Sequence, residues 1–539
     1  MKGSKDLKQE LEAFQIIAAG GTNILGEIHK SPSGEIVETG ITSVHDRSTK
    51  ISKDTIVGIG SIGKQHTAAT LLKLWDQELS DRKSGKIDEE HFVDEEGNRG
   101  INVKLKKFLP ALKEKYPDCL NFFSQIEQYD YFDQITLADL LNHTHGLGAR
   151  DNAQMTKLIL ESEGNPLSLS DIVKSSHKRT YQEVGSVKGE PQEIADRYGQ
   201  MCYGNLGYDL AAMVVEVVTG KEFDQVVKDA LLEPHELSST TTQSDHLELY
   251  DSGRFRGEEV DVARGFHLEG GVEIDYNKLT NTRGAGGMKS TIADLEKFGR
   301  LYMSGDMFEN EEVKQAARVD DKTPVENMYT TEKSIYHLAI EVGGDGRLGH
   351  HGNDTVFESD LRYDPKTGET EIMLQVIENL THNIARKAFL EIYGEERAGK
   401  LDSAIVDSGF FPLFHSSGRP KPGSEKFNKI ASALILENPD LYQILSDYGN
   451  IKQEIERRSV DDLKERSDEV IKSIKSTLSV AEGKDRHVVR AGSRRNIEAL
   501  DLATPRQDIK QQEKESKSWV EKMSEKQNTS SSKDGYREI

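Results

Sequence analysis

A serine and a lysine three residues apart are the side chains in this sequence best suited to covalent chemistry. Ser61 and Lys64 stand in the stretch GSIGKQHTAATLLKLW at residues 60–75, directly after the β-rich run TIVGI. The apolar spacing that follows predicts a helix, which would bring both side chains to one face at its positively polarised end. A serine becomes a nucleophile when a base lies within hydrogen-bond reach, and a desolvated lysine can serve as that base.

The same spacing occurs at two other places, so the pair alone does not assign a catalytic role. Ser175/Lys178 and Ser530/Lys533 repeat it in polar, unpatterned sequence. An N-capping serine followed by a surface lysine gives this spacing without any chemistry. The pair at Ser61 differs because it follows a β-rich run and opens an apolar helix, and this context favours Ser61 as a nucleophile.

Composition argues against several classes of function. The 539 residues carry a formal net charge of −23, and a protein that binds nucleic acid needs a basic surface, so we expect no nucleic-acid partner. Cys119 and Cys202 provide no disulfide framework, which fits a reducing compartment. No stretch is apolar enough to span a membrane, and the acidic residues before the apolar run at 13–19 are wrong for a signal peptide. We therefore expect a cytoplasmic protein. Export by a route that needs no N-terminal signal would not be detectable in the sequence.

The remaining patterns predict a sheet with helices packed on it. Apolar spacing and capping residues predict helices over 4–19, 135–147, 210–218 and 292–303. A hairpin is expected over 23–39, and two further strands lie within 350–376 on either side of the turn DPKTG. His143 and His145 have no acidic or cysteine partner at useful spacing, so they are interpreted as loop histidines. Nothing in the sequence indicates a metal or an organic cofactor.

The character of the chain changes near residue 400. We predict a folded domain over 1–398, a linker over 399–426, a helical extension over 427–480 and a polar, disordered tail over 481–539. The charged helices of the extension indicate a partner protein or self-association.

Several motifs stand in the order found in one enzyme family. The Ser61-x-x-Lys64 helix resembles the first motif of the serine β-lactamase and penicillin-binding-protein-like hydrolases. LLNHTHGL at 140–147 resembles their LLxHTSGL, with His145 replacing the serine, and Tyr203-Gly204-Asn205 is similar to their Tyr-x-Asn motif. GGMKST at 286–291 and the His350-His351-Gly352 run resemble two later motifs. The branch it resembles holds class C β-lactamases, D-alanyl-D-alanine carboxypeptidases and esterases.

The resemblance covers roughly residues 10–395 and implies an α+β, β-lactamase/transpeptidase-like fold. In that fold an antiparallel sheet is flanked by helices and accompanied by an all-helical lobe. The helical and partly disordered C-terminal extension lies outside the resemblance.

Roles for the catalytic residues follow from the same resemblance. Ser61 would attack the carbonyl and form an acyl-enzyme, and Lys64 would help to remove the serine proton. Tyr203, as a phenolate or through shared hydrogen bonds, would act as base and then as acid to the leaving group. Taken alone, Tyr203 is better interpreted as a buried aromatic residue with a satisfied hydroxyl, and its place in the ordered set of motifs reverses this interpretation.

The resemblance also implies a substrate-binding set made of Asn205, His350, Gly352 and Asn353. Asn205 would position the substrate amide or Lys64, and the backbone N–H groups of Ser61 and Asn353 would form the oxyanion hole. Class C β-lactamases have lysine where His350 stands here. A histidine is only partly charged near neutral pH, which weakens carboxylate binding and argues against an efficient penicillin-degrading enzyme.

The sequence therefore predicts a serine hydrolase, esterase-like or D-amino-acid peptidase and carboxypeptidase-like, that cleaves an ester or a peptide-like amide. Its partner would be a small-molecule or peptide-like substrate. The alternative is a catalytically idle copy of the fold that works through its C-terminal helices. Retention of Ser61, Lys64, Tyr203 and Asn205 together favours the enzyme.

Overall fold

The computed structural model divides the chain into two compact units, one of residues 25–377 and one that contains residues 1–24 and 378–539. The residues described are 24–43, 48–147, 149–150, 158, 167–177, 198–246, 248–256, 258–269, 272–275, 283–319, 325–326, 333–354, 356–377, 388–394, 451 and 472. The helix predicted over 4–19 and nearly all of the predicted linker, helical extension and tail lie outside these residues. The partner surface at 427–480 therefore stays a prediction.

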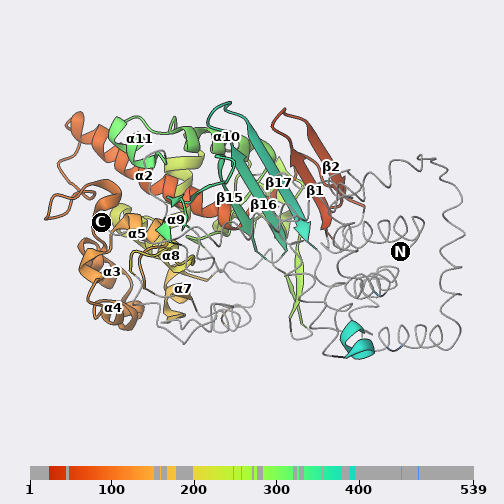
Figure 1. The fold of residues 1–539 in the computed structure, drawn as a ribbon, viewed down its shortest axis with the longest axis horizontal. Helices are drawn as coiled ribbons and strands as arrows, with labels where there is room; N and C mark the ends of the chain where they lie inside the picture. The colour runs from red at the N-terminus through yellow and green to blue at the C-terminus, as the bar shows by residue number, and fades with distance from the viewer. Residues whose placement is uncertain are drawn as a thin grey trace, which may run out of the picture. The chain divides into compact units, whose positions relative to one another are not determined.

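A seven-stranded sheet is the framework of the unit 25–377 (Figure 1). In spatial order its strands are β13 (Tyr336–His337), β14 (Ile340–Val342), β15 (Leu348–Asn353), β16 (Phe357–Tyr363), β17 (Thr370–Ile377), β1 (Ile24–Lys30) and β2 (Ile36–Gly40). Each pairing with a described register is antiparallel. The predicted N-terminal hairpin and the two strands around DPKTG are confirmed.

Shorter strands form separate two-stranded pairs. They are β3 (Val57–Gly58) with β10 (Lys289–Ser290), β4 (Ala149–Arg150) with β5 (Ser176–His177), β6 (Arg254–Phe255) with β7 (Glu258–Glu259), β8 (Phe266–Glu269) with β9 (Val272–Asp275), and β11 (Val325–Glu326) with β12 (Lys333–Ser334). The pair β3–β10 matters for the site because β3 leads directly into the segment that carries Ser61.

Helices cover the sheet and build a separate lobe. They are α2 (Gly63–Lys83), α3 (Leu109–Lys115), α4 (Leu120–Ile126), α5 (Leu137–Leu141), α7 (Leu169–Lys174), α8 (Leu206–Thr219), α9 (Phe223–Val227), α10 (Ile292–Ser304) and α11 (Glu311–Ala317). Helix α10 packs on β15, β16 and β17, whereas α3, α5, α7 and α9 gather around α8 (Figure 1). In the part of the chain that the structure describes, no helix combines the length and apolar character needed to cross a membrane.

Local chemistry explains where these helices begin and end. Thr136 and Asp139 form a reciprocal capping box at the start of α5, and Thr291 caps α10. Helix α8 ends at Thr219 and is capped by Gly220, whose φ of 68° places it in the left-handed region. Helix α5 ends at Leu141, earlier than the predicted 147, because His143 has a φ of 61° that no helix continues through.

Two glycines allow the backbone of β15 to lie against the segment that carries Ser61. A Cβ atom on Gly60, whose φ is 47°, would lie 2.8 Å from the backbone nitrogen of Asn353. A Cβ atom on Gly352 would clash with the carbonyl oxygen of Ile59. Ser359 of β16 donates a hydrogen bond to that same carbonyl at 2.8 Å, which fixes the strand β3 to the central sheet.

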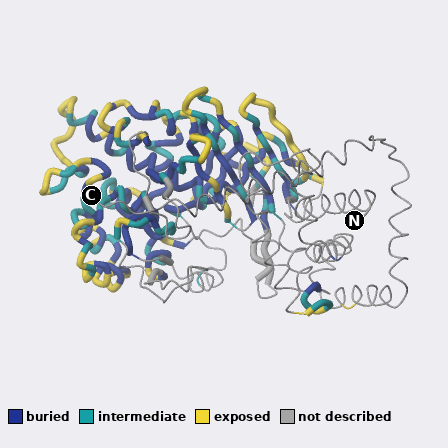
Figure 2. Tube along the Cα trace, viewed as in Figure 1, coloured by how far each residue is buried: buried dark blue, intermediate teal, exposed yellow. Residues whose placement is uncertain are grey.

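Buried segments run through the interior of this unit (Figure 2). Several histidines are among the buried residues, and their burial keeps them neutral. Burial lowers the pKa of His66 and His145 to about 4 and that of His350 to about 3. Burial also holds the pKa values of His143 and His246 well below the ordinary 6.5. The ring of His66 stacks on Phe298 with the ring centroids 3.8 Å apart.

We predict that acid destabilises this unit through these histidines. Between the ordinary pKa of 6.5 and the lowered values, each histidine binds a proton in the unfolded chain but not in the folded one. The free energy of unfolding therefore falls as the pH decreases through this window, by about 1.4 kcal/mol per pH unit for each histidine. Denaturant unfolding between pH 7 and pH 4.5 measures this slope.

The variant His66→Phe keeps the stacking on Phe298 but cannot be protonated. We expect its slope to be shallower than that of the wild type by about one proton in the same window. An unchanged slope would show that His66 is not held neutral in the folded protein.

Candidate active site

The predicted nucleophile and its lysine are in hydrogen-bond contact. Ser61 lies in the short 3-10 turn Gly60–Ile62 that runs into α2, and Lys64 is fully buried in the first turn of α2. Lys64 Nζ donates to Ser61 Oγ at 2.9 Å, to Asn205 Oδ1 at 2.7 Å and to the carbonyl oxygen of Ala285 at 2.9 Å. An ammonium has three N–H bonds, so these acceptors satisfy the charged form of Lys64 completely.

Tyr203 completes the group around Ser61. Its hydroxyl hydrogen-bonds the Ser61 side chain, and its ring centroid lies 4.9 Å from Lys64 Nζ. Burial raises the pKa of Tyr203 above its ordinary value, and the hydrogen bond from Ser61 only partly opposes this. The resting side chain is therefore a neutral phenol, which fits a role through shared hydrogen bonds better than a permanent phenolate.

His143 stands in the loop after α5, as predicted, and its ring lies against Tyr203. The two ring centroids are 4.3 Å apart, and His143 is buried. Its Nδ1 accepts the backbone N–H of Gly204 at 3.3 Å, and its Nε2 lies 3.1 Å from the hydroxyl of Tyr336. Because a backbone N–H can only donate, Nδ1 is the acceptor, and Nε2 carries the proton that it donates to Tyr336.

Tyr336 extends this chain of hydrogen bonds to the sheet. Its hydroxyl lies 3.0 Å from Nε2 of His350, while Nδ1 of His350 contacts the backbone carbonyl of His351. A carbonyl only accepts, so Nδ1 of His350 carries the proton and Nε2 accepts from Tyr336. The chain from Gly204 through His143, Tyr336 and His350 therefore runs in one direction, with a backbone group fixing each end.

The expectation that His350 is partly charged near neutral pH is wrong. The side chain is wholly buried, and this burial lowers its pKa to about 3, although Glu341 acts in the opposite direction. His350 is thus neutral at pH 7 and supplies no fixed charge for a substrate carboxylate. Burial decides the charge here, and burial of a single side chain cannot be read from sequence.

The structure brings the other predicted residues to the same place. The ring of His350 lies 6.1 Å from that of Tyr203, and Asn205 binds Lys64 directly. Gly352 and Asn353 lie beside Ile59 and Gly60 through their backbones. The side chain of Asn353 donates to Glu358 on β16 at 3.0 Å, so its backbone is the part that lies toward Ser61.

Sequence reasoning missed Tyr336 and Glu341. Both stand on strands of two and three residues, too short to show an alternating pattern. Pairing of β14 with β15 sets Glu341 opposite Gly349, next to the two histidines of β15. Glu341, His350 and His351 are also the described residues that could hold a metal ion.

Comparison with known proteins identifies the family of this chain. The family model Beta-lactamase matches residues 32–393. The curated protein Unguisins hydrolase ungD' of Aspergillus campestris is 26% identical over 260 residues, which are 48% of this chain and 39% of that protein. This chain therefore matches less than half the length of that relative.

Three solved structures are similar to part of this chain. A D-stereospecific amidohydrolase from Streptomyces sp. is 18% identical with a TM-score of 0.45, over 68% of this chain and 93% of that one. An octameric penicillin-binding protein homologue from Pyrococcus abyssi is 19% identical with a TM-score of 0.45, over 69% and 73%. A D-amino acid amidase from Ochrobactrum anthropi SV3 is 17% identical with a TM-score of 0.44, over 69% and 91%.

The family match spans well over half of the chain, and the predicted antiparallel sheet with flanking helices is confirmed. The chain belongs to the Beta-lactamase family of serine hydrolases.

Proposed function

We propose that this chain is an active hydrolase that cleaves an ester or a peptide-like amide through an acyl-enzyme on Ser61. The observation that carries the proposal is the position of Ser61 Oγ, 2.9 Å from Lys64 Nζ and hydrogen-bonded to Tyr203. A nucleophilic serine requires such contact with groups that exchange protons. The curated relative is named a hydrolase, which supports the same reaction class.

Before Ser61 can attack the substrate, the pair formed by Lys64 and Tyr203 must lose one proton. While Tyr203 is neutral and Lys64 is an ammonium, neither group accepts the Ser61 proton. Loss of one proton from the Lys64–Tyr203 pair creates the base, and the two residues share this ionisation. Ser61 Oγ then bonds to the substrate carbonyl carbon and gives its proton to the pair.

The second step returns that proton. The bond from the carbonyl carbon to the leaving oxygen or nitrogen breaks, and the Lys64–Tyr203 pair protonates the leaving group. Water then attacks the carbonyl carbon of the acyl-Ser61 ester and gives a proton to the same pair. The bond from this carbon to Ser61 Oγ breaks, the acid product leaves, and the pair returns the proton to Ser61. The backbone N–H groups of Ser61 and Asn353 are our candidates for the oxyanion hole, since Gly60 and Gly352 let their segments approach closely.

The charge distribution favours substrates that do not depend on a carboxylate. His350, which stands where class C β-lactamases have lysine, is neutral and hydrogen-bonded to Tyr336. A neutral ester or amide therefore fits this part of the pocket better than a penicillin-like carboxylate.

We predict that a fluorophosphonate adds once to the wild type and does not add to Ser61→Ala. Intact-mass measurement of both proteins gives the result directly. Ser175→Ala is the matched control, because Ser175 begins a second Ser-x-x-Lys run but donates its hydroxyl to the carbonyl of Ile172. It should be labelled like the wild type.

Two outcomes would contradict the proposal. An adduct that persists in Ser61→Ala would place the nucleophile elsewhere. A folded wild type that never reacts would favour an idle scaffold working through its C-terminal region.

Replacement of Tyr336 tests the chain of hydrogen bonds. Tyr336→Phe keeps the ring but leaves one nitrogen of His143 and one of His350 without their partner. We expect the free energy of unfolding to fall by about 1–3 kcal/mol. We also expect fluorophosphonate labelling to slow by about tenfold or more, because His143 packs on Tyr203.

Tyr302→Phe is the control for a lost buried hydroxyl. Tyr302 donates to the carbonyl of Leu338 at 2.6 Å and belongs to α10. Its loss should lower stability without slowing the labelling. Equal labelling rates in the two variants would show that Tyr336 is only structural.

A further inference from the structure

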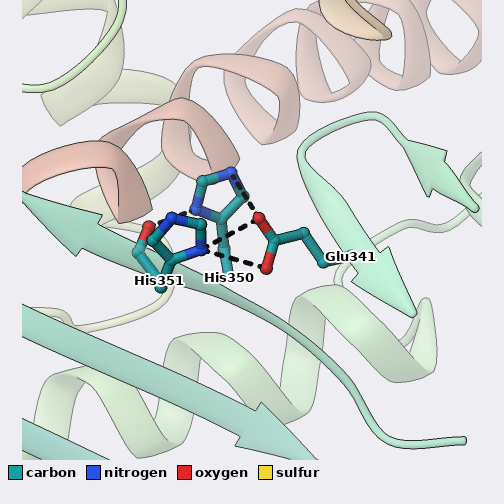
Figure 3. A group of neighbouring side chains, drawn as sticks. All are labelled: Glu341, His350 and His351. Carbon is teal, nitrogen blue, oxygen red and sulfur yellow. Dashed lines mark hydrogen bonds and ion pairs between the residues drawn. The ribbon is translucent and has the colours of Figure 1, made fainter. Parts of the chain in front are cut away.

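We propose that Glu341, His350 and His351 form a binding site for a divalent transition-metal ion, with Zn²⁺ as the best fit, at the edge of the Ser61 site (Figure 3). Each residue offers one ligand atom, and these three atoms lie within 4.8 Å of one another. Two imidazole nitrogens and one carboxylate are a common protein ligand set for zinc, with a fourth position left to water.

The distances among the ligand atoms match such an ion after small movements. Nδ1 of His351 lies 3.0 and 3.2 Å from the two oxygens of Glu341, and Nε2 of His350 lies 3.9 Å from the nearer one. Ligand bonds of about 2.1 Å in a tetrahedral site place neighbouring ligand atoms about 3.4 Å apart. The observed distances lie on both sides of that value. His351 is the ligand free to adjust, because 56% of its side chain is exposed.

Neighbouring groups already orient the ligands. Nδ1–H of His350 donates to the backbone carbonyl of His351, so its lone pair is on Nε2, which points toward Glu341 (Figure 3). Histidines that bind metals usually donate their second nitrogen in this way. Arg362 lies 3.5 Å from the second oxygen of Glu341, and Asp360 balances the charge of this arginine at 2.8 Å.

The ion and the hydroxyl of Tyr336 compete for one lone pair. Tyr336 donates to Nε2 of His350 at 3.0 Å, and a metal bound there must break this hydrogen bond. A neutral hydrogen bond contributes little net free energy compared with three metal–ligand bonds. Metal binding therefore breaks the link from His350 through Tyr336 to His143, and His143 is the residue that packs on Tyr203. The expected slowing of Ser61, unlike the binding itself, rests on the proposed function.

The same sheet contains a matched control. His29 of β1 lies 3.2 Å from Glu371, and Arg347 lies 2.6 Å from the other oxygen of that carboxylate. This group repeats the histidine, glutamate and arginine of the candidate site but has one histidine instead of two. We expect it not to hold the ion.

A calorimetric titration of the purified full chain with Zn²⁺ tests the site. The wild type should bind one equivalent, and His351→Ala and Glu341→Gln should each weaken binding by at least tenfold. His29→Ala should bind like the wild type. Because His351 is exposed, its variant is expected to fold, and circular dichroism checks this.

A second arm separates this proposal from the catalytic one. Ser61→Ala should bind Zn²⁺ like the wild type, whereas Zn²⁺ should slow fluorophosphonate labelling of the wild type but not of His351→Ala. Failure of all labelling would contradict the proposed reaction and leave the binding result intact. The metal site would be overturned if the wild type bound no Zn²⁺, or if His351→Ala and Glu341→Gln both bound Zn²⁺ as tightly as the wild type.

Discussion

A buried lysine, Lys64, organises this site. Removing a charged lysine from water costs several kcal/mol unless its N–H groups find acceptors. Lys64 finds three, and they come from segments far apart in the sequence: Ser61, Asn205 and the carbonyl of Ala285. The requirement to satisfy this one charge therefore fixes the start of α2, the start of α8 and the segment before β10 to a common point.

The same charge shapes the surrounding histidines. Burial is the main cause of the low pKa of both His143 and His350, and the positive charge of Lys64 adds to it. Positive charge in this part of the site is thus concentrated on one group, which points at the nucleophile. The neutral histidines serve as hydrogen-bond partners of Tyr336 and set its orientation. The Glu341 carboxylate lies 3.9 Å from Nε2 of His350, the same nitrogen that accepts from Tyr336, and the adjacent ligand His351 is exposed.

Sequence reasoning identified the groups whose roles depend on local spacing and ordered motifs. Ser61 and Lys64 lie three residues apart at a helix start, and Tyr203 and Asn205 stand in a short motif. These four residues can therefore be identified from the sequence alone. The fold followed from clear alternation on β16 and β17 and from the caps of α5 and α10. The sequence did not reveal the charge of His350, because this charge depends on burial, and it did not reveal the contact of His143 with Tyr203. Tyr336 and Glu341 enter through the register of very short strands, which no sequence pattern specifies.

The most direct test of this account is the rate at which a fluorophosphonate labels Ser61 when Lys64 is replaced. Lys64→Met keeps the length of the side chain and removes its charge and donors, and we expect labelling to slow by about 100-fold or more. Lys73→Met is the control on the same helix, because Lys73 binds Asp76 and the carbonyl of Met307 instead of Ser61. This control should react at the wild-type rate. A folded Lys64→Met protein that reacts as fast as Lys73→Met would contradict the central claim that Lys64 activates Ser61.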